Sequence, residues 1–345
     1  MKNGVPRILV IRLSAIGDVV RVLPALAVLR RAYPDARLDW AVERKSAGVL
    51  EGHPGVDRVM VYERSQRLGR ATVEFVRFCR MIQRERYDIV VDFHGALKSG
   101  LIAAASRAPK RWGFAPPRAR DGSHWAVHQH VALPHGRMNR VDENLLLAGS
   151  LVETPLDIEG RLHAPEALRG GVDLFMDGLL KNGKRVIAMH APVDRPEKQW
   201  PLEHYAALGD LLLADGRFEV MLTWGPGQRA LAEQVAALME RTPILAPETR
   251  GLLEYAWLVG RAHAYVGGDT GPMHIAWMMG VPVVALFGGT DPLKHAPWKA
   301  PCEVLYAGDP AAGPPSERLA EARRRLEAIT PEMAYEACRR LSLGE

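Results

Sequence analysis

The chain has few cysteines and no long apolar run, and these two absences exclude several classes of protein. Its three cysteines, Cys79, Cys302 and Cys338, are widely spaced and form no CxxC pair. Such spacing argues against a disulfide framework or a zinc site and fits a reducing cytosol. No apolar stretch approaches the roughly 18–20 residues that span a bilayer. Arg12 interrupts the first apolar stretch, so we expect neither a signal peptide nor a membrane span.

Low-complexity tracts and fixed-period repeats are also absent. The 345 residues exceed the size of one typical core, which predicts two domains. A formal net charge of +5 suits an anionic partner such as a phosphate, a nucleotide or an acidic lipid. Nucleic acid is not an expected partner, because no recognised module is present and the basic residues lack aromatic interleaving.

Strand-like and helix-like patterns alternate along the whole chain, which is typical of βαβ units and predicts an α/β fold with parallel sheets. A loop-rich stretch over residues 151–171 separates two sets of elements, so we expect two Rossmann-like domains, 1–165 and 166–345. The last helix is a candidate for packing back onto the first domain. Strands are expected over residues 7–13, 38–42, 59–62, 87–93, 185–190, 218–223, 264–267 and 282–287, and helices over 19–32, 73–83, 97–106, 202–214, 228–240, 272–279, 317–328 and 331–341.

Asp18 follows the first expected strand and lies at or near the start of a helix, directly after Gly17. Aspartate is a common N-cap residue, so capping alone is one interpretation. The other interpretation is a proton acceptor, because the helix dipole keeps such a carboxylate ionised. Ligands of doubly wound sheets bind beyond the carboxyl ends of the strands, and this location favours the second interpretation.

The segment GGDTGPMH, residues 267–274, also follows an expected strand and opens a helix. Glycines let backbone N–H groups approach a ligand, and a helix N-terminus favours a diphosphate. Asp269, Thr270 and Gly271 are therefore candidate donor-binding residues, with Asp269 or Thr270 as the helix cap. His274 is either a satisfied histidine on a buried helix face or a further phosphate contact, and the glycines before it favour contact.

Two more loops of the second half carry candidate residues. Lys198, in EKQWP, is either a solvated surface lysine or a point charge suited to phosphate. Trp224 and Gly225, in TWGPG, either line a base or ribose pocket or form an ordinary turn around a packed tryptophan. We expect these loops and the glycine-rich segment to converge on a cleft that faces the Asp18 loop.

Motifs for metals and dinucleotides are missing. The chain has no Asp-x-Asp and no His/Cys cluster with the spacing of metal ligands, so no metal is expected. It also has no G-x-G-x-x-G, which disfavours a dehydrogenase, and no cofactor is expected. An anionic acceptor would need basic residues at the Asp18 edge. The candidates are Arg64, Arg67 and Arg70 in a loop after the third strand, Lys98 after the DFHGAL segment, and Arg120 in a basic stretch with Lys110, Arg111 and Arg118.

Four segments together give the chain a specific resemblance to glycosyltransferase family 9, the lipopolysaccharide heptosyltransferases. They are ILVIRLSAIGDVVRVLPAL, VVDFHGALKSGLIA, EKQWPLEHY and GGDTGPMHIAWMMGVPVVALFG. The DFHGALKS stretch looks most like heptosyltransferase I, which adds the first heptose to the Kdo sugar of the lipid A core.

The resemblance implies a GT-B fold, an ADP-heptose donor, inversion at the anomeric carbon and no metal. It makes Asp18 the general base and Lys198 the phosphate-contacting lysine. The donor-binding run then comprises Asp269, Thr270, Gly271 and His274. It also implies an anionic, lipid-linked sugar acceptor that the basic residues bind. The expected location is the cytoplasm, with peripheral contact at the inner membrane.

One segment departs from the pattern of heptosyltransferase I. Residues 190–195, HAPVDR, lack the hydroxyl pair that this type tends to carry before its lysine. Another nucleotide sugar or another acceptor therefore stays open as an alternative. A second alternative is a non-catalytic nucleotide or glycolipid binding protein of the same fold.

Overall fold

The structure, a computed structural model, describes residues 5–65, 68–134, 137–152, 160–309 and 318–343. The chain forms two compact units, Met1–His163 and Ala164–Glu345, and each contains one six-stranded sheet. No helix among the described residues is both long enough and apolar enough to cross a membrane.

The sheet of the first unit is entirely parallel, with the strand order β3-β2-β1-β4-β5-β6. Four of the five residues of β1 are buried, because a central parallel strand is covered on both faces. The strands are β1 (Arg7–Ile11), β2 (Arg37–Glu43), β3 (Arg58–Tyr62), β4 (Ile89–Asp92), β5 (Lys110–Phe114) and β6 (Gln129–Val131).

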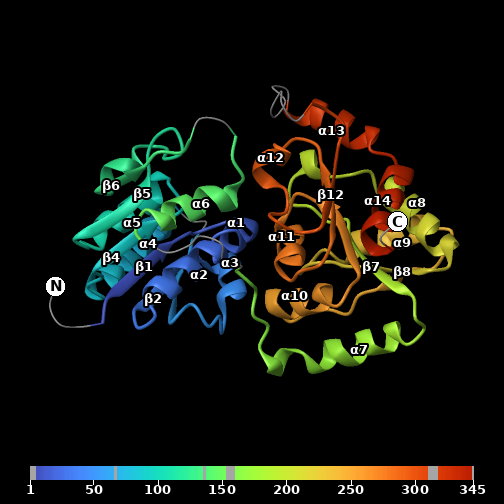
Figure 1. The fold of residues 1–345 in the computed structure, drawn as a ribbon, viewed down its shortest axis with the longest axis horizontal. Helices are drawn as coiled ribbons and strands as arrows, with labels where there is room; N and C mark the ends of the chain where they lie inside the picture. The colour runs from blue at the N-terminus through green and yellow to red at the C-terminus, as the bar shows by residue number, and fades with distance from the viewer. Residues whose placement is uncertain (1–4, 66–67, 135–136, 153–159, 310–317, 344–345) are drawn as a thin grey trace. The chain divides into compact units, whose positions relative to one another are not determined.

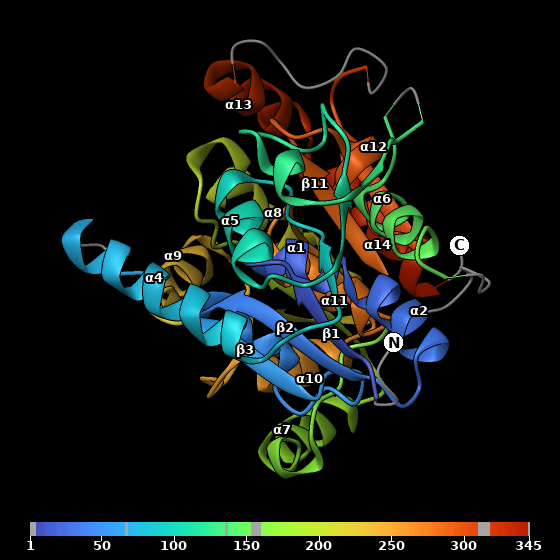
Figure 2. The same cartoon turned by 90° about the vertical axis from the view of Figure 1, so that its left-hand side faces the viewer.

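Helices cover both faces of this sheet. Figure 2 shows α4 and α5 on one side of the blue strands and α2 and α6 on the other. The helices are α1 (Ile16–Val20), α2 (Leu23–Ala32), α3 (Arg44–Ala47), α4 (Leu68–Arg84), α5 (Leu97–Ala105) and α6 (Arg140–Gly149), with short 3-10 turns η1 (Gly48–Leu50) and η2 (Ser123–Ala126).

The sheet of the second unit repeats this arrangement, with the order β12-β11-β10-β7-β8-β9 and parallel pairing throughout. Its core combines the apolar residues of the central strands with those of the helices on one face. The strands are β7 (Arg185–His190), β8 (Phe218–Leu222), β9 (Ile244–Leu245), β10 (Ala264–Gly268), β11 (Val283–Phe287) and β12 (Cys302–Tyr306).

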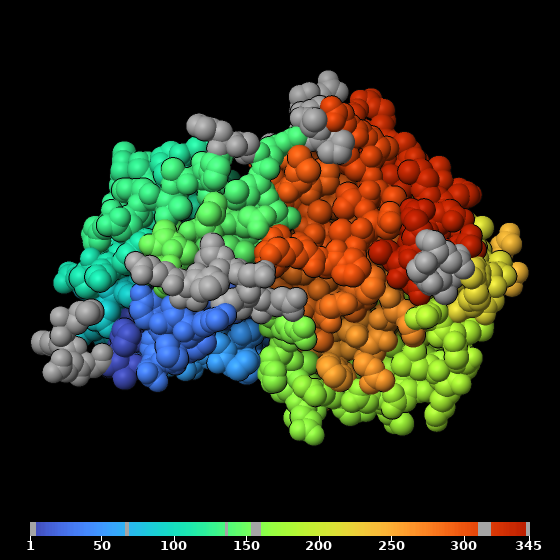
Figure 3. All heavy atoms as spheres, viewed as in Figure 1, coloured from blue at the N-terminus to red at the C-terminus, as the bar shows by residue number. Residues whose placement is uncertain are grey.

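In the second unit α14 packs against α8 and β12, while α7 packs against α10 (Figure 1). Figure 3 shows the surface of α7 (yellow-green) against that of α10 (orange). The helices are α7 (Gly170–Leu180), α8 (Leu202–Asp215), α9 (Arg229–Leu238), α10 (Leu252–Gly260), α11 (Gly271–Met278), α12 (Pro292–His295), α13 (Arg318–Ala328) and α14 (Pro331–Leu343), with 3-10 turns η3 (Glu166–Leu168) and η4 (Pro196–Lys198).

The expected helix over residues 19–32 is wrong as one element. The structure has two helices there, α1 and α2, separated by Arg21 and Val22. Pro24 explains the break, because proline cannot donate a backbone hydrogen bond and its ring clashes with the carbonyl four residues earlier, at Val20. Helix α1 ends at Val20, and Pro24 lies in the first turn of α2.

Several elements are not expected from the sequence. The most relevant of them is β5, because it changes where part of the expected basic stretch lies. The segment KRWGF, which opens the expected basic stretch, forms a strand between β4 and β6. Lys110 and Arg111 therefore lie at the amino end of a strand, and not with the loops that follow the strands. The other unexpected elements are β6, β9, β12, α3, α6, α7, α10 and α12.

Each sheet has a point at which neighbouring strands lead away in opposite directions. In the first unit it lies between β1 and β4, and in the second between β7 and β10. Loops at such a switch point leave a crevice beyond the carboxyl ends of the strands, where α/β proteins bind ligands. The segments after these four strands are therefore the first place to look for a site.

Helix α13 lies very close to the loop after β11. A Cβ atom added at Gly288 would lie 2.6 Å from Leu326 Cγ and 2.7 Å from the carbonyl oxygen of Ala322. Both neighbours belong to α13, so the glycine is what allows this approach.

We expect Gly288→Ala to lower the free energy of unfolding by about 1–3 kcal/mol, because the new methyl group would force α13 away from the sheet. Gly178→Ala is the matched control: Gly178 lies within α7 with no neighbouring atom within 4 Å of an added Cβ. That change should raise stability by about 0.5–1 kcal/mol. Denaturant titration measures both, and equal signs for the two variants would contradict the packing argument.

Candidate functional site

Asp18 is the third residue of α1, just beyond the carboxyl end of β1. The N-cap residue of this helix is Ala15, so Asp18 lies near the cap but is not the cap residue itself. One carboxylate oxygen of Asp18 accepts the Ala15 N–H at 3.4 Å, which is a capping contact. The carboxylate also forms ion pairs with Arg12 and Arg21, whose side chains are 9% and 6% exposed, compared with 29% for Asp18. Capping is therefore only one of its interactions.

Arg12, which directly follows β1, makes two hydrogen bonds in addition to its ion pair with Asp18. Arg12 Nη1 donates to the carbonyl oxygen of Phe93 at 2.8 Å, and the Trp40 indole donates to the carbonyl of Arg12 at 3.2 Å. Burial lowers the pKa of Arg12, while the charge of Asp18 opposes that shift. Two guanidinium groups favour the ionised form of the carboxylate between them. Asp18 is therefore a fixed, partly exposed anion.

A second carboxylate, Asp92, organises the turn after β4. Its Oδ1 accepts the N–H groups of His94 at 2.9 Å and Gly95 at 3.1 Å, and its Oδ2 accepts the Ser99 hydroxyl at 2.8 Å. Burial raises the pKa of Asp92 although these hydrogen bonds act against the shift. Gly95 has a φ of +67°, which glycine tolerates without strain. Asp92 thus shapes the loop after β4, the strand that pairs with β1.

His94, in this turn, is neutral and lacks a partner on one nitrogen. Burial, with the nearby charge of Arg12, lowers its pKa to about 3. Its Nδ1 is buried and makes no hydrogen bond within the described part of the chain. Behind it, Arg118 donates to the His94 carbonyl at 3.2 Å and pairs with buried Glu143 at 2.8 Å. His94 therefore adds an uncharged polar group close to Arg12.

The basic residues expected to bind the acceptor differ in their surroundings. Lys98 pairs with Glu43 at 3.2 Å and lies 5.3 Å from the centre of the Tyr62 ring. The expectation that Arg70 lies in a loop is wrong, because it is the third residue of α4. Arg67 lies outside the described residues. The exposed members of the set are Arg64, Arg70 and Arg120.

In the second unit, an ion pair between Lys198 and Asp269 links the loop after β7 to the loop after β10. Lys198 Nζ donates to a carboxylate oxygen of Asp269 at 2.9 Å and also to the Asp269 carbonyl. An added Cβ at Gly268 would lie only 3.0 Å from the carbonyl oxygen of Lys198, so the glycine permits the close approach. Lys198 is only 18% exposed, so it is not a freely solvated lysine.

His274, in the first turns of α11, is the third member of this group and contacts Asp269. Trp277 Nε1 donates to His274 Nδ1 at 3.1 Å, and since an indole N–H is only a donor, the imidazole proton must reside on Nε2. That Nε2–H faces Asp269 Oδ1 at 3.2 Å. The Nε2 hydrogen bond and the Lys198 charge help to hold the pKa of buried Asp269 well below its usual range.

The surroundings of His274 are those of a buried helix face, one of its two interpretations from the sequence. The side chain is buried, and both ring nitrogens are engaged within the protein. In this structure it therefore orients Asp269, and its contact with a phosphate stays a prediction. Thr270 is the N-cap residue of α11, and Pro272 lies in the first turn as expected. The Thr270 hydroxyl turns back to the Gly268 carbonyl at 3.4 Å and does not cap the helix.

Trp224 and Gly225 follow β8, and Gly225 begins a tight turn in which the Gln228 N–H donates to its carbonyl at 3.0 Å. The Trp224 ring is buried and donates to the Ala246 carbonyl at 3.2 Å, with the Arg229 guanidinium 5.7 Å from the ring centre. The Gly225 N–H donates to the Gln228 side chain at 3.2 Å. The tryptophan is thus packed into the core of this unit.

A buried polar network that is not expected from the sequence lies beside this turn. His190 Nδ1 is 3.0 Å from the Thr223 hydroxyl and 3.3 Å from the Tyr255 hydroxyl. Burial lowers the pKa of His190 to about 3, so its ring is neutral. The network fixes the ends of β7 and β8, which carry the Lys198 and Trp224 loops.

Comparison with known proteins identifies this arrangement. Residues 75–322 match the model of glycosyltransferase family 9 (heptosyltransferase), which is more than two thirds of the chain. The chain belongs to glycosyltransferase family 9. It is 27% identical to lipopolysaccharide heptosyltransferase 1 of Escherichia coli K12 over 299 residues, covering 83% of this chain and 89% of the relative.

Two solved structures confirm the GT-B fold of this family 9 glycosyltransferase. A family 9 protein from Veillonella parvula superposes with a TM-score of 0.85 at 25% identity, over 100% of this chain and 99% of the other. E. coli heptosyltransferase WaaC with ADP-2-deoxy-2-fluoro heptose gives a TM-score of 0.72 at 22% identity, over 96% and 98%.

Sequence reasoning missed three residues at the core of these sites in the family 9 chain. Arg12 and Arg21 flank Asp18, and Trp277 sets the tautomer of His274. A signal existed for Arg12, because a charged residue at the end of an otherwise apolar strand has to find a partner. No comparable signal identifies Trp277, since tryptophan on a buried helix face is ordinary core.

We expect Trp277→Phe to release the tautomer of His274, because phenylalanine cannot donate to Nδ1. The wild type should show the Nε2–H form in ¹⁵N NMR of the imidazole, whereas the variant should show a mixture or the Nδ1–H form. Losing this buried hydrogen bond should also cost about 1 kcal/mol of stability. A variant that keeps a pure Nε2–H imidazole would show that Asp269 alone sets the tautomer.

Proposed function

We propose that this glycosyltransferase moves heptose from ADP-heptose onto the Kdo–lipid A inner core of lipopolysaccharide, with inversion and without a metal. The first unit would bind the lipid-linked acceptor at the cytoplasmic face of the inner membrane, and the second the nucleotide sugar. The activity for which the E. coli relative is named and the fluorinated ADP-heptose of the WaaC structure support the substrates. The observation that carries the reaction is the partly exposed Asp18 carboxylate, paired with two guanidinium groups at a switch point.

On the donor side, Lys198 is the residue best suited to the diphosphate. Its ammonium group is already desolvated beside Asp269, so a shift of the side chain would bring it to a phosphate oxygen. The N–H groups of Thr270 and Gly271 at the start of α11 would add anion contacts. Asp269, oriented by His274, would retain the lysine and face the sugar. Trp224 and Gly225 would border the base.

On the acceptor side, positive charge is the common feature. Arg64, Arg67, Arg70, Lys98 and Arg120 would bind the carboxylate and phosphate groups of the lipid-linked sugar. Arginine suits this task because its planar fork binds a carboxylate or a phosphate through two hydrogen bonds. His94, whose buried Nδ1 has no partner among the described residues, would accept a hydrogen bond from an acceptor hydroxyl.

The chemical step requires one proton acceptor and one stabilised leaving group. As the acceptor oxygen bonds to the anomeric carbon, its proton passes to Asp18. The bond from that carbon to the diphosphate oxygen breaks on the opposite face, which inverts the configuration. Such assistance from a carboxylate is worth about 10²–10⁴-fold in rate. Positioning of the two substrates and the charge of Lys198 would supply the remainder.

A different nucleotide sugar is the second candidate, and one observation favours it. Ala191, Pro192 and Val193 follow β7 at the point where heptosyltransferase I would carry two hydroxyl groups. Without these hydroxyls, fewer hydrogen bonds would select the donor. Thermal shifts with ADP-sugars compared with UDP-sugars would decide between the two.

We expect Asp18→Asn to lower kcat by about 10²–10⁴-fold with ADP affinity unchanged, because the amide cannot accept the proton. Stability should also fall, by about 1–3 kcal/mol, since Arg12 and Arg21 would face a neutral group. Single-turnover assays at a temperature where both proteins are folded measure the first effect. The control is Asp18→Asn with Arg21→Gln, which should regain stability but not activity. Full activity in folded Asp18→Asn would contradict the proposal that Asp18 is the general base.

We expect Lys198→Met to weaken ADP binding by about 10–100-fold, because a charge-assisted hydrogen bond contributes roughly 1.5–3 kcal/mol. Lys184→Met is the matched control, since Lys184 pairs with Glu219 at 2.8 Å in the same unit but at the amino end of β7. Isothermal titration calorimetry with ADP gives both affinities. Equal affinities for the two variants would remove Lys198 from the donor site.

A further inference from the structure

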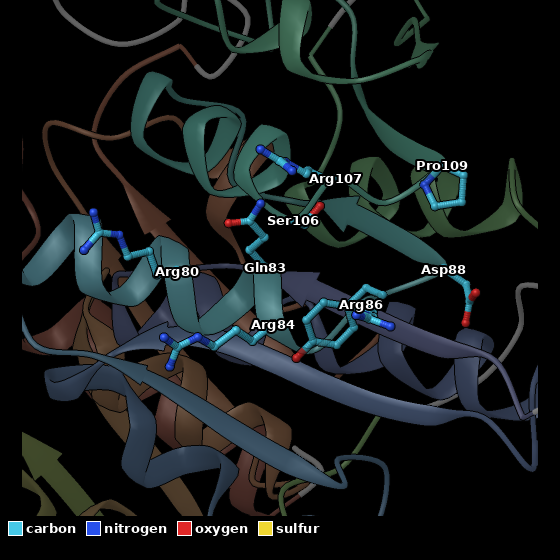
Figure 4. A pocket seen from close by; sticks show the side chains of 9 residues that line it. Arg80, Gln83, Arg84, Arg86, Asp88, Ser106, Arg107 and Pro109 are labelled. Carbon is cyan, nitrogen blue, oxygen red and sulfur yellow. The ribbon is translucent and has the colours of Figure 1, made fainter.

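A second cluster of positive charge lies at the edge of the first sheet opposite Asp18. An open pocket of about 720 Å³ is formed by the end of α4, the end of α5 and the segments that lead into β4 and β5. Figure 4 shows the side chains that surround it. Four of the lining residues are arginines: Arg80, Arg84, Arg86 and Arg107.

Carboxylates do not neutralise this pocket. The guanidinium groups of Arg80, Arg84 and Arg86 make no hydrogen bond or ion pair to any residue that the structure describes. The Arg107 guanidinium donates to the side-chain oxygen of Gln83 at 2.7 and 3.2 Å, which leaves its charge uncompensated. Glu85 is in the same turn, but it pairs with Arg37 at 2.7 Å and Arg58 at 3.1 Å. The one lining carboxylate is Asp88, whose Oδ2 accepts the N–H of Arg7. The pocket therefore keeps an excess of positive charge.

Backbone conformation gives a second, independent indication. Arg86 and Arg107 have φ values of +52° and +55°, just beyond the ends of α4 and α5. Helices commonly end with glycine at such a position, because a residue with a Cβ is strained there. The chain places an arginine at both positions, and both arginines line the same pocket. Local backbone stability favours glycine at both positions. The hydrogen bonds from Arg107 to Gln83 offset part of that penalty, whereas the Arg86 guanidinium has no such contact among the described residues.

We propose that this pocket binds a phosphate-bearing anion, supplied either by the headgroup of an anionic phospholipid or by a soluble phosphate compound. Guanidinium groups match phosphate oxygens through paired hydrogen bonds. A pocket of this volume exceeds one phosphate and has room for the group attached to it. The proposal is independent of the proposed transfer reaction, because none of the four arginines belongs to the donor or acceptor sets.

The experiment compares the full-length wild type with Arg80→Gln/Arg84→Gln and with a control of equal charge loss, Arg31→Gln/Arg241→Gln. Both control arginines are exposed and lie outside the pocket. One arm measures binding to phosphatidylcholine vesicles with and without phosphatidylglycerol, and the other measures inorganic pyrophosphate affinity by calorimetry. Each arginine near an anionic membrane strengthens binding about fivefold, so the pocket variant should bind anionic vesicles about 30-fold more weakly.

A loss confined to vesicles would support the proposal and identify the lipid source, whereas a loss confined to pyrophosphate would support it with a soluble source. Equal behaviour of the pocket variant and the control in both arms would overturn it. Arg86→Gly separates binding from folding. It should raise the melting temperature, because glycine relieves the positive φ, and yet weaken binding. A more stable Arg86→Gly that binds both probes as the wild type does would also overturn the proposal.

Discussion

Carboxylates at the carboxyl edges of the two sheets are held by basic partners. This pairing limits which residues can be changed at the candidate site without loss of stability. Asp18 is held by Arg12 and Arg21, and Asp269 by Lys198 together with the neutral ring of His274. Removing one member of such a group leaves a desolvated charge without compensation, which costs several kcal/mol in a buried site. The residues proposed for chemistry are therefore also structural, and a single substitution changes both properties.

The two units hold a carboxylate at the same place in the sheet, but with different residues. In each, a carboxylate lies at the switch point of a parallel sheet, close to the beginning of a helix. In the first unit two guanidinium groups surround it and leave it partly exposed. In the second a lysine and a histidine cover it almost completely, since Asp269 is 5% exposed. A partly exposed anion is accessible to the proton of a ligand, whereas a covered one is better placed to position its neighbours.

Local patterns in the sequence are sufficient to predict most of the buried strands and the loops that follow them. The strand over residues 185–190 has the bounds that its pattern predicts, because a buried run between polar segments needs no tertiary information. Strand β5 escapes prediction because Lys110 and Arg111 hide its pattern. The choice of Asp18 follows from its position after a strand, but its partners on either side depend on tertiary packing. The hydrogen bond from Trp277 to His274 also depends on tertiary packing, and it gives His274 a structural role that the sequence pattern alone does not show.

Helix α4 places the proposed acceptor residues and the arginine pocket at opposite ends of one rigid element. Arg70 lies in its first turn and Arg84 at its last residue. Fourteen residues at 1.5 Å each separate these positions by about 21 Å along the axis. At physiological ionic strength the Debye length is about 8 Å, so charge bound at one end is largely screened from the other. An anion in the pocket would leave the electrostatics of the acceptor side nearly unchanged, and any coupling between them would have to pass through a movement of α4 itself.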